Sequence, residues 1–136
     1  MGWAIAQEIA LLGANVFLMA RNVEKLKENC NLLDTSKGQQ HGFVLADFSK
    51  TENVKTAIED FIKEKNISIL VNNTGGPPAG LIENAKPEDF LSALNLHLIN
   101  NHTLATAILP NMKSQKFGRI INIISTSVKI PLHNLG

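Results

Sequence analysis

The sequence predicts an α/β fold in which a doubly wound parallel sheet lies between helices. Segments whose apolar residues recur at helical spacing alternate with short apolar runs along the 136 residues, a pattern typical of parallel sheets. One such run, residues 67–71, is apolar enough for a strand buried on both faces. Ligands of open α/β sheets bind beyond the carboxyl ends of the strands, so we expect a site at the polar turn after this run.

The chain opens with a predicted helix over its first 12 residues, which Gly13 ends as a C-cap. The face expected to be buried consists of Ala4, Ile5, Ile9 and Leu12. A short apolar strand follows at 16–19. Because a helix precedes this first strand, we expect the chain to begin in the middle of a strand–helix unit, without the strand that would come before the helix.

The same alternation continues up to the apolar run at residues 67–71. We expect an amphipathic helix over 23–33, a strand over 42–45 and a further helix up to residue 62. Residues 49–52 have the Ser-x-x-Glu pattern of a capping box, which would satisfy backbone amides at the start of that helix.

The turn after the run reads Asn72-Asn73-Thr74-Gly75-Gly76-Pro77-Pro78. Its two asparagines supply hydrogen-bond donors and acceptors where the strand ends. The glycines allow the backbone to approach a ligand closely, and the prolines are expected to stiffen the exit from the turn.

A long helix is expected to begin near Pro87, with acidic residues in its first turn. The side expected to face the core consists of Leu91, Leu94, Leu98, Asn101, Ala105, Ile108 and Met112. Pro110 is expected to bend or end this helix. A buried strand from Gly118 onwards would then deliver the hydroxyl of Ser125 to the carboxyl edge of the sheet, beside Asn72.

Composition excludes several classes of protein. Hydrophobic residues make up 44% of the chain and the net charge is +1, so the chain is globular and has no electrostatic case for nucleic acid or an anionic membrane. Cys30 is the only cysteine, which fits a reducing compartment, and no apolar run approaches the roughly 18 residues of a membrane span. We therefore expect a single incomplete domain over residues 1–136, located in the cytoplasm, that binds neither nucleic acid nor membrane.

Two segments resemble signatures of the short-chain dehydrogenase/reductase family. Asn72-Asn73-Thr74-Gly75 is similar to the family's Asn-Asn-Ala-Gly turn, with Thr74 in place of Ala, and residues 118–125 are similar to its Gly-x-Ile-x-Asn-Ile-x-Ser strand. The resemblance implies a Rossmann-type fold that lacks its first strand and everything after the fifth. It also implies a nicotinamide cofactor, hydride transfer to or from a carbonyl or alcohol, a homotetramer and, in similar members, 3-oxoacyl thioester substrates.

Cofactor-binding residues follow from the same resemblance. It implies roles for Gly2 as the last glycine of the pyrophosphate loop, for Asp47 at the adenine, and for Asn73 and Gly75 beside the cofactor. Arg21 is the first charged residue after the strand that follows the opening helix. A guanidinium there suits the 2′-phosphate of NADP(H), whereas an acid at this place binds the ribose of NAD(H). NADP(H) is therefore favoured, with NAD(H) as the alternative.

The resemblance also implies two catalytic residues. Ser125 would hydrogen-bond the substrate carbonyl oxygen as charge develops on it, and Asn95 would interrupt its helix and help to hold a water for proton relay. The family's general acid is a tyrosine, with a lysine one helical turn later. This chain contains no tyrosine, and that pair would fall just beyond Gly136, so we expect the chain alone to be inactive.

Other interpretations stay open. The chain could be a non-catalytic fragment or relative that only binds nucleotide or a partner, or an unrelated flavodoxin-like signalling domain with Asp47 as a poor phosphoacceptor. Each candidate residue also has a purely structural interpretation. Asp47 would bond its own turn, Ser125 would cap the end of a strand, Arg21 would lie in solvent and Asn95 would lie on an outer face.

Overall fold

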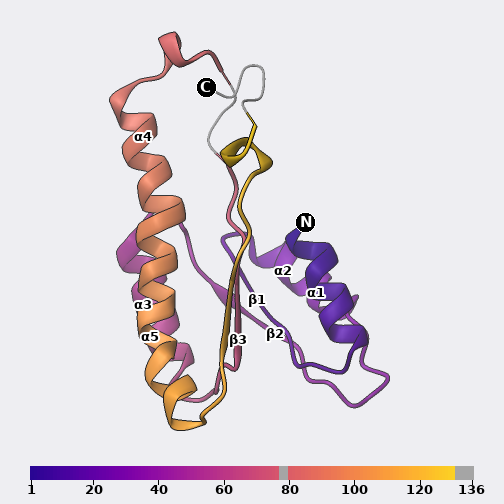
Figure 1. Cartoon of the computed structure of the whole chain (residues 1–136). Helices are drawn as coiled ribbons and strands as arrows, with labels where there is room; N and C mark the ends of the chain where they lie inside the picture. Colours follow the sequence, from indigo (N-terminus) through magenta and orange to yellow (C-terminus); the bar gives the residue numbers. More distant parts are fainter. Residues whose placement is uncertain (77–79, 131–136) are drawn as a thin grey trace.

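The computed structural model describes residues 1–76 and 80–130, so the expectation for Pro77 and Pro78 lies outside the described residues. The strands are β1 (Phe17–Ala20), β2 (Gly42–Leu45), β3 (Ile69–Asn72) and β4 (Arg119–Asn122). The helices are α1 (Gly2–Leu11), α2 (Val23–Asn31), α3 (Thr51–Phe61), α4 (Pro87–Leu94) and α5 (Asn100–Ser114). Helices and strands therefore alternate as the sequence predicts (Figure 1).

The strand pairings are parallel, as expected, but the described strands form two pairs instead of one continuous sheet. β1 pairs with β2, and β3 pairs with β4. No backbone ladder joins β1 to β3 within the described ranges. α1 begins beside the end of β3, because a Cβ on Gly2 would lie 3.5 Å from Cγ of Asn73. A strand leading into α1 would therefore end at this break, where the sequence predicts a missing strand.

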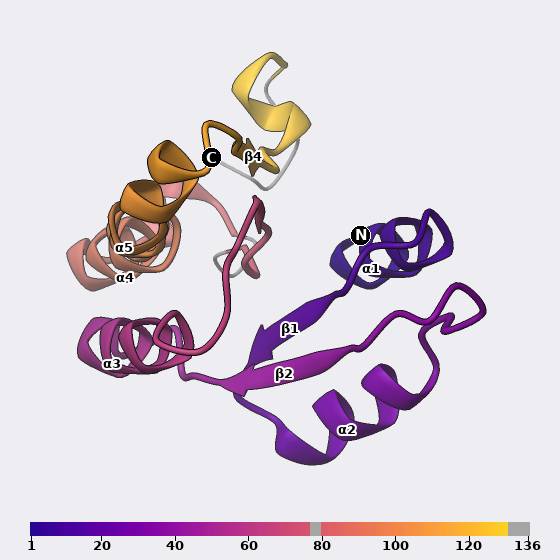
Figure 2. The same ribbon diagram turned by 90° about the horizontal axis from the view of Figure 1, so that it is seen from below.

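Helices cover both faces of β1. Leu18 packs against the buried cluster formed by Ala6 and Ala10 of α1 together with Leu33. Met19 packs against a second cluster, between α3 and α5. The buried members of this second cluster are Ala46, Val54, Ile58, Leu104, Ile108 and Met112. Successive strand residues point to opposite faces, so one strand contributes to both cores. Figure 2 shows α1 and α2 on one side of the strands and α3 to α5 on the other.

The buried face of α1 differs from the expected one. Ala6 and Ala10 are the buried residues, whereas Ala4 is exposed and Leu12 is 80% exposed. Residues four apart lie on one face of a helix, and two alanines on that face let the helix approach its neighbours closely. The prediction that the larger apolar side chains mark the buried face of α1 is therefore wrong. The expected C-cap is confirmed, since Gly13 has a φ of +101°, the left-handed conformation that favours glycine.

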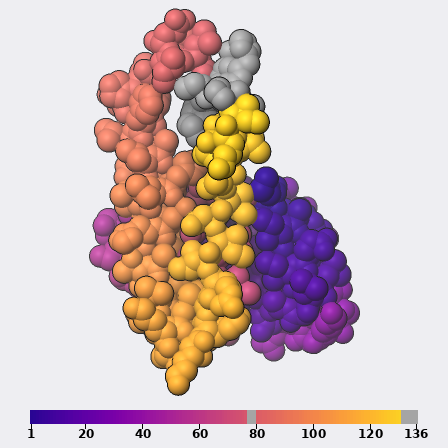
Figure 3. Space-filling model, viewed as in Figure 1, coloured from indigo at the N-terminus to yellow at the C-terminus, as the bar shows by residue number. Residues whose placement is uncertain are grey.

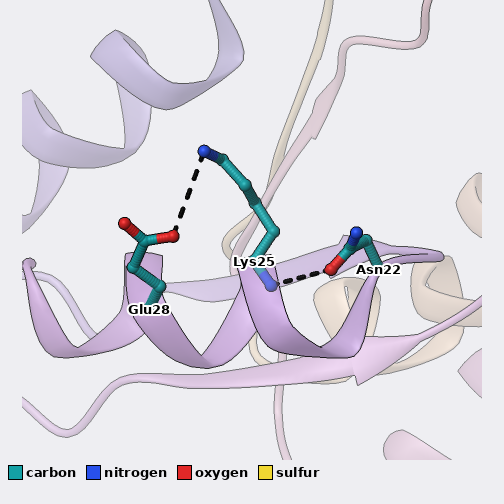
Figure 4. A network of polar contacts seen from close by, with 3 residues as sticks. All are labelled: Asn22, Lys25 and Glu28. Atoms are coloured by element: carbon teal, nitrogen blue, oxygen red, sulfur yellow. Dashed lines mark hydrogen bonds and ion pairs between the residues drawn. The ribbon is translucent and has the colours of Figure 1, made fainter.

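A side-chain cap fixes the start of α2. Asn22 Oδ1 accepts a hydrogen bond from the backbone amide of Lys25 at 2.8 Å (Figure 4). Such a cap contributes about 0.5–2 kcal/mol. The ion pair of Lys25 with Glu28, 4.0 Å long and exposed, adds little in comparison. As a result α2 begins immediately after the Arg21–Asn22 corner, which holds the backbone of Arg21 at the helix N-terminus.

The long helix is continuous but changes its winding in the middle. A π-turn at Asn95–Ile99 joins α4 to α5. Leu91, Leu94 and Leu98 are exposed, against expectation, whereas the buried residues of α5 are Asn100, Leu104, Ile108 and Met112. Ile108 and Met112 are buried as expected, but Asn100 and Leu104 are buried in place of Asn101 and Ala105. A π-turn holds more residues than an α-turn, so it shifts the inward face in the first turns of α5. Pro110 does not end the helix, which continues to Ser114. No helix of the described residues is long and apolar enough to cross a membrane.

The second strand pair is more exposed than predicted. Ile69 of β3 is 45% exposed, and all four residues of β4 are exposed. β4 has only β3 as a hydrogen-bonded neighbour among the described strands. The yellow-orange segment that contains it lies at the surface in Figure 3. The sequence shows how apolar these strands are, but their burial depends on which other elements cover them.

A side-chain amide pair closes the second strand pair at its carboxyl end. Asn72 faces Asn122 in the ladder, and Asn72 Nδ2 donates to Asn122 Oδ1 at 2.8 Å. Asn72 is only 4% exposed, so its amide depends on a protein partner. The backbone oxygen of Asn72 accepts a further bond from Ile123 at 2.9 Å.

We predict that Asn122→Ala lowers the free energy of unfolding by about 1–3 kcal/mol, because it leaves the buried Asn72 amide without its acceptor. Asn73→Ala is the matched control, since it removes the same side chain from an exposed neighbouring position and should change stability by less than about 0.5 kcal/mol. Urea unfolding of both variants measures the difference. Equal losses would show that the amide pair does not stabilise the strands.

Candidate functional site

The strand ends gather the predicted site residues at one edge of the molecule. These residues are Arg21 after β1, Asp47 after β2, Asn73 after β3 and Ser125 after β4. A buried side chain of the long helix braces this edge, because Asn100 Nδ2 donates to the backbone oxygen of Phe48 at 2.6 Å. The loop after β2 is thereby tied to α5, which packs along the other strand pair.

Gly2, Asn73 and Gly75 lie where α1 meets the end of β3. Gly2 is next to Asn73, and no side chain caps the first amides of α1. Unpaired amides at a helix N-terminus attract anions such as phosphate. A Cβ on Gly75 would meet no atom within 4 Å, and the φ of Gly75 is outside the left-handed region. Neither packing nor backbone conformation within the described residues requires glycine here, so the open space above it can receive a ligand.

Arg21 is exposed and lies beside the N-terminus of α2. Within the part of the chain that the structure describes, its guanidinium takes part in no ion pair. The backbone amide of Ala46 donates to the oxygen of Ala20 at 2.9 Å, which brings the loop of Asp47 alongside. A guanidinium without a partner at this edge can bind a phosphate group, and the structure is equally compatible with a solvated arginine.

Asp47 bonds its own turn, as its structural interpretation predicts. Asp47 Oδ1 accepts from the hydroxyl of Ser49 at 2.8 Å and from its amide at 3.0 Å. These bonds, with smaller contributions from Lys50 and Arg21, hold the pKa of Asp47 below its usual range. The capping-box prediction is wrong, because Ser49 is engaged here and α3 begins after Lys50 without a side-chain cap. Both bonds use Oδ1, which leaves Oδ2 to accept from a ligand.

Ser125 lies three residues beyond β4 and is exposed. Its oxygen accepts from the amide of Ser127 at 3.1 Å and from the hydroxyl of Ser127 at 2.7 Å, so it caps the short 3₁₀ turn at Thr126–Val128. The expectation of a buried strand reaching Ser125 is wrong, and Asn122 is the residue beside Asn72. A serine hydroxyl that accepts two bonds still has its own proton to donate, so the cap leaves Ser125 able to bind a carbonyl oxygen.

The long helix is interrupted where the sequence predicts, but another side chain faces the site. Asn95 begins the π-turn and is exposed, as its outer-face interpretation requires. His97, two residues later, is half-buried, and its Nδ1 lies 2.6 Å from Thr74 Oγ1. Sequence reasoning missed His97 and also the buried Asn100. A signal for His97 existed in Thr74, the one departure from the Asn-Asn-Ala-Gly pattern, since a hydroxyl there calls for a polar partner.

Known proteins are similar to this chain in sequence. The family model described as short chain dehydrogenase matches residues 1–135. The chain is 32% identical over 138 residues to inactive hydroxysteroid dehydrogenase-like protein 1 of Pongo abelii, covering 99% of this chain and 42% of that protein. It is 32% identical over 126 residues to 3-oxoacyl-acyl-carrier-protein reductase FabG of Chlamydia trachomatis, covering 92% of this chain and 51% of that protein.

A solved structure gives the same result. L-sorbose reductase of Gluconobacter frateurii, complexed with NADPH and L-sorbose, superposes with a TM-score of 0.89 at 30% identity, covering 98% of this chain and 51% of that one. The chain therefore spans about half the length of the relatives it matches. With a family match over residues 1–135 and this superposition, the chain belongs to the short-chain dehydrogenase family and has its Rossmann-type fold.

Proposed function

We propose that a full-length parent of this chain transfers hydride between a nicotinamide nucleotide and a small-molecule carbonyl or alcohol. The observation that carries the proposal is the shared edge of the strands. One part of this edge has an uncapped helix N-terminus and open space at Gly75, and the neighbouring strand leads to the hydroxyl of Ser125. A nucleotide and a carbonyl substrate both need sites at this edge.

The residues present fit a dinucleotide. Gly75 leaves open space for part of the cofactor, and Gly2 lies in contact with Asn73 at the uncapped start of α1, where a pyrophosphate would find unpaired amides. Asp47 Oδ2 can accept from the amino group of adenine. Arg21 suits the 2′-phosphate of NADP(H), the cofactor form in the sorbose reductase structure. NADP(H) is therefore the favoured cofactor, with NAD(H) as the alternative.

The bound nicotinamide supplies the hydride, and the chain supplies orientation and a hydrogen-bond donor. Ser125 would donate a hydrogen bond to the substrate oxygen and keep its proton, and this bond would strengthen as negative charge develops on that oxygen. Asn95, at the start of the π-turn, is the proposed holder of a water on the proton path. The resemblance implies a tyrosine as general acid, and these 136 residues include none, so we propose that a part of the parent outside them supplies it. We therefore infer that the chain alone does not turn over substrate.

Substrate and assembly belong to the same proposal. Reduction of a 3-oxoacyl thioester is supported by the chlamydial relative of that name. A cytoplasmic homotetramer is part of the proposal. An exposed apolar stripe along the long helix supports self-association, because a second copy could cover it. The residues of this stripe are Phe90, Leu91, Leu94 and Leu98. The second candidate is a non-catalytic relative that only binds nucleotide or a partner, which the inactive relative from Pongo abelii favours.

Arg21→Ala in a full-length parent is predicted to weaken NADPH binding about tenfold or more and to leave NADH binding nearly unchanged. A hydrogen-bonded pair with a charged group contributes about 1.5–3 kcal/mol, and only NADPH has the 2′-phosphate. Titration of both nucleotides by fluorescence measures the two dissociation constants.

Two controls belong to this titration. Arg21→Lys keeps the charge but loses the planar fork, so it should fall between wild type and Arg21→Ala. Lys27→Ala removes an exposed charge elsewhere on α2 and should change neither constant. Equal losses for both nucleotides in Arg21→Ala would show that Arg21 does not read the 2′-phosphate. If wild type binds neither nucleotide, the proposed function fails.

Ser125→Ala in the same parent is predicted to lower kcat by roughly 10²–10³, the loss on removing one oxyanion-hole donor. NADPH affinity should change little. Stability should fall by no more than the loss of one exposed cap, about 0.5–2 kcal/mol, because removal of this exposed side chain leaves no cavity. Steady-state kinetics with a carbonyl substrate measure kcat, and a nucleotide titration measures affinity.

The structure decides which control is clean. Ser127 bonds Ser125 directly, so Ser127→Ala would disturb the candidate itself. Thr126→Val removes a neighbouring exposed hydroxyl that makes no hydrogen bond to the Ser125 side chain among the described residues and should keep kcat within about threefold of wild type. If Thr126→Val abolishes turnover while Ser125→Ala does not, the catalytic hydroxyl is one residue further on. If both keep full activity, Ser125 only caps the turn.

A further inference from the structure

The turn at residues 73–76, which carries two of the proposed nucleotide contacts, has few tethers of its own. β3 ends at Asn72, and Asn73, Gly75 and Gly76 are exposed. A Cβ on either glycine would meet no atom within 4 Å. Within the described residues, the turn is joined to another element by one hydrogen bond, that between Thr74 Oγ1 and His97 Nδ1 at 2.6 Å.

The π-turn contains His97, the second partner of this bond. His97 is the middle residue of Asn95–Ile99; it and Leu96 are half-buried, while the other three residues of the π-turn are exposed. π-turns inside α-helices occur frequently at functional sites. Here the side chain directed inward, to the end of β3, is an imidazole.

A second threonine–histidine pair, within α5, is a weaker contact that serves for comparison. Thr106 Oγ1 lies 3.5 Å from His102 Nε2, one helical turn away, and the bond is exposed. The hydroxyl of Thr106 also has a better partner, the backbone oxygen of His102 at 2.8 Å. The pair of Thr74 and His97 is shorter, partly buried and separated by 23 residues of sequence, so it joins two elements that local geometry does not bring together.

We propose that Thr74 and His97 form a latch that positions the turn at residues 73–76 for nucleotide binding. This proposal rests on the proposed function, because the nucleotide of that function is the ligand for which the latch positions the turn. His97 is a positioning residue that acts through Thr74, and it keeps the turn, with Asn73 in contact with Gly2 of α1, in the conformation that receives the nucleotide. Without the latch, binding has to order the turn first, and this ordering weakens the apparent affinity.

The latch is tested in a full-length parent with variants that remove one partner at a time. Thr74→Val keeps the shape of threonine without the hydroxyl, His97→Phe keeps a ring without nitrogens, and Thr74→Ser keeps the hydroxyl. We expect Thr74→Val and His97→Phe each to raise the dissociation constant for NADPH by about two- to tenfold, the size of one neutral hydrogen bond. The double variant should be no weaker than the weaker single variant, and Thr74→Ser should bind like wild type.

The control pair is Thr106→Val and His102→Phe, which should leave NADPH affinity unchanged. The value of kcat at saturating NADPH should stay within about threefold in the latch variants, since a positioning defect is overcome once nucleotide is bound. Additive losses in the double variant, an affinity loss in Thr74→Ser as large as in Thr74→Val, or a large loss of kcat at unchanged affinity would each overturn the latch.

Failure of the latch and failure of the proposed function give different results. If the wild-type parent binds no nucleotide, the proposed function fails, and the latch is judged by thermal unfolding of the same variants. Thr74→Val and His97→Phe should then each lower Tm, and the double variant should melt no lower than the less stable single variant. Additive shifts in Tm, or none, would show that the two residues are not coupled.

Discussion

The register of β3 against β4 is the constraint on which the site depends. Asn72 stands opposite Asn122, and their side-chain bond lies at the point where both strands end. Because strand side chains alternate between faces, a slip of one residue would turn Asn72 away from its partner. The register also decides which segments leave the strands side by side. The turn at residues 73–76 and the segment that leads to Ser125 start from this pair.

The π-turn determines what the long helix does on each side of it. Before it, α4 presents exposed leucines, and after it, α5 packs its buried residues against α3 and the strands. A regular helix through residues 87–114 would have kept one apolar stripe along its length. The change of phase instead separates a face open to a partner from a face used by the core, and it places His97 against Thr74 at the boundary.

Much of the fold follows from local sequence patterns. The strand at 42–45 and the cap at Gly13 were predictable, because periodicity and backbone preference decide them. The helix interruption at Asn95 was instead implied by the family resemblance. The rest depends on neighbours that a sequence does not display. Alanines instead of larger residues face the core in α1, and β4 is exposed because little covers it. In α5, Ile108 and Met112 are buried as predicted, but just after the π-turn Asn100 and Leu104 are buried instead of Asn101 and Ala105.

Structural and functional interpretations of the site residues are compatible. Asp47 and Ser125 both bond their own turns, as simple turn residues would. In each case the bonds use only part of the group, since Asp47 keeps Oδ2 and Ser125 keeps its proton. These local bonds fix the direction of the remaining lone pair or proton before a ligand arrives, which lowers the ordering cost of binding. Gly75 differs, because no contact within the described residues explains why a glycine stands there. A ligand that packs against Gly75 would explain it.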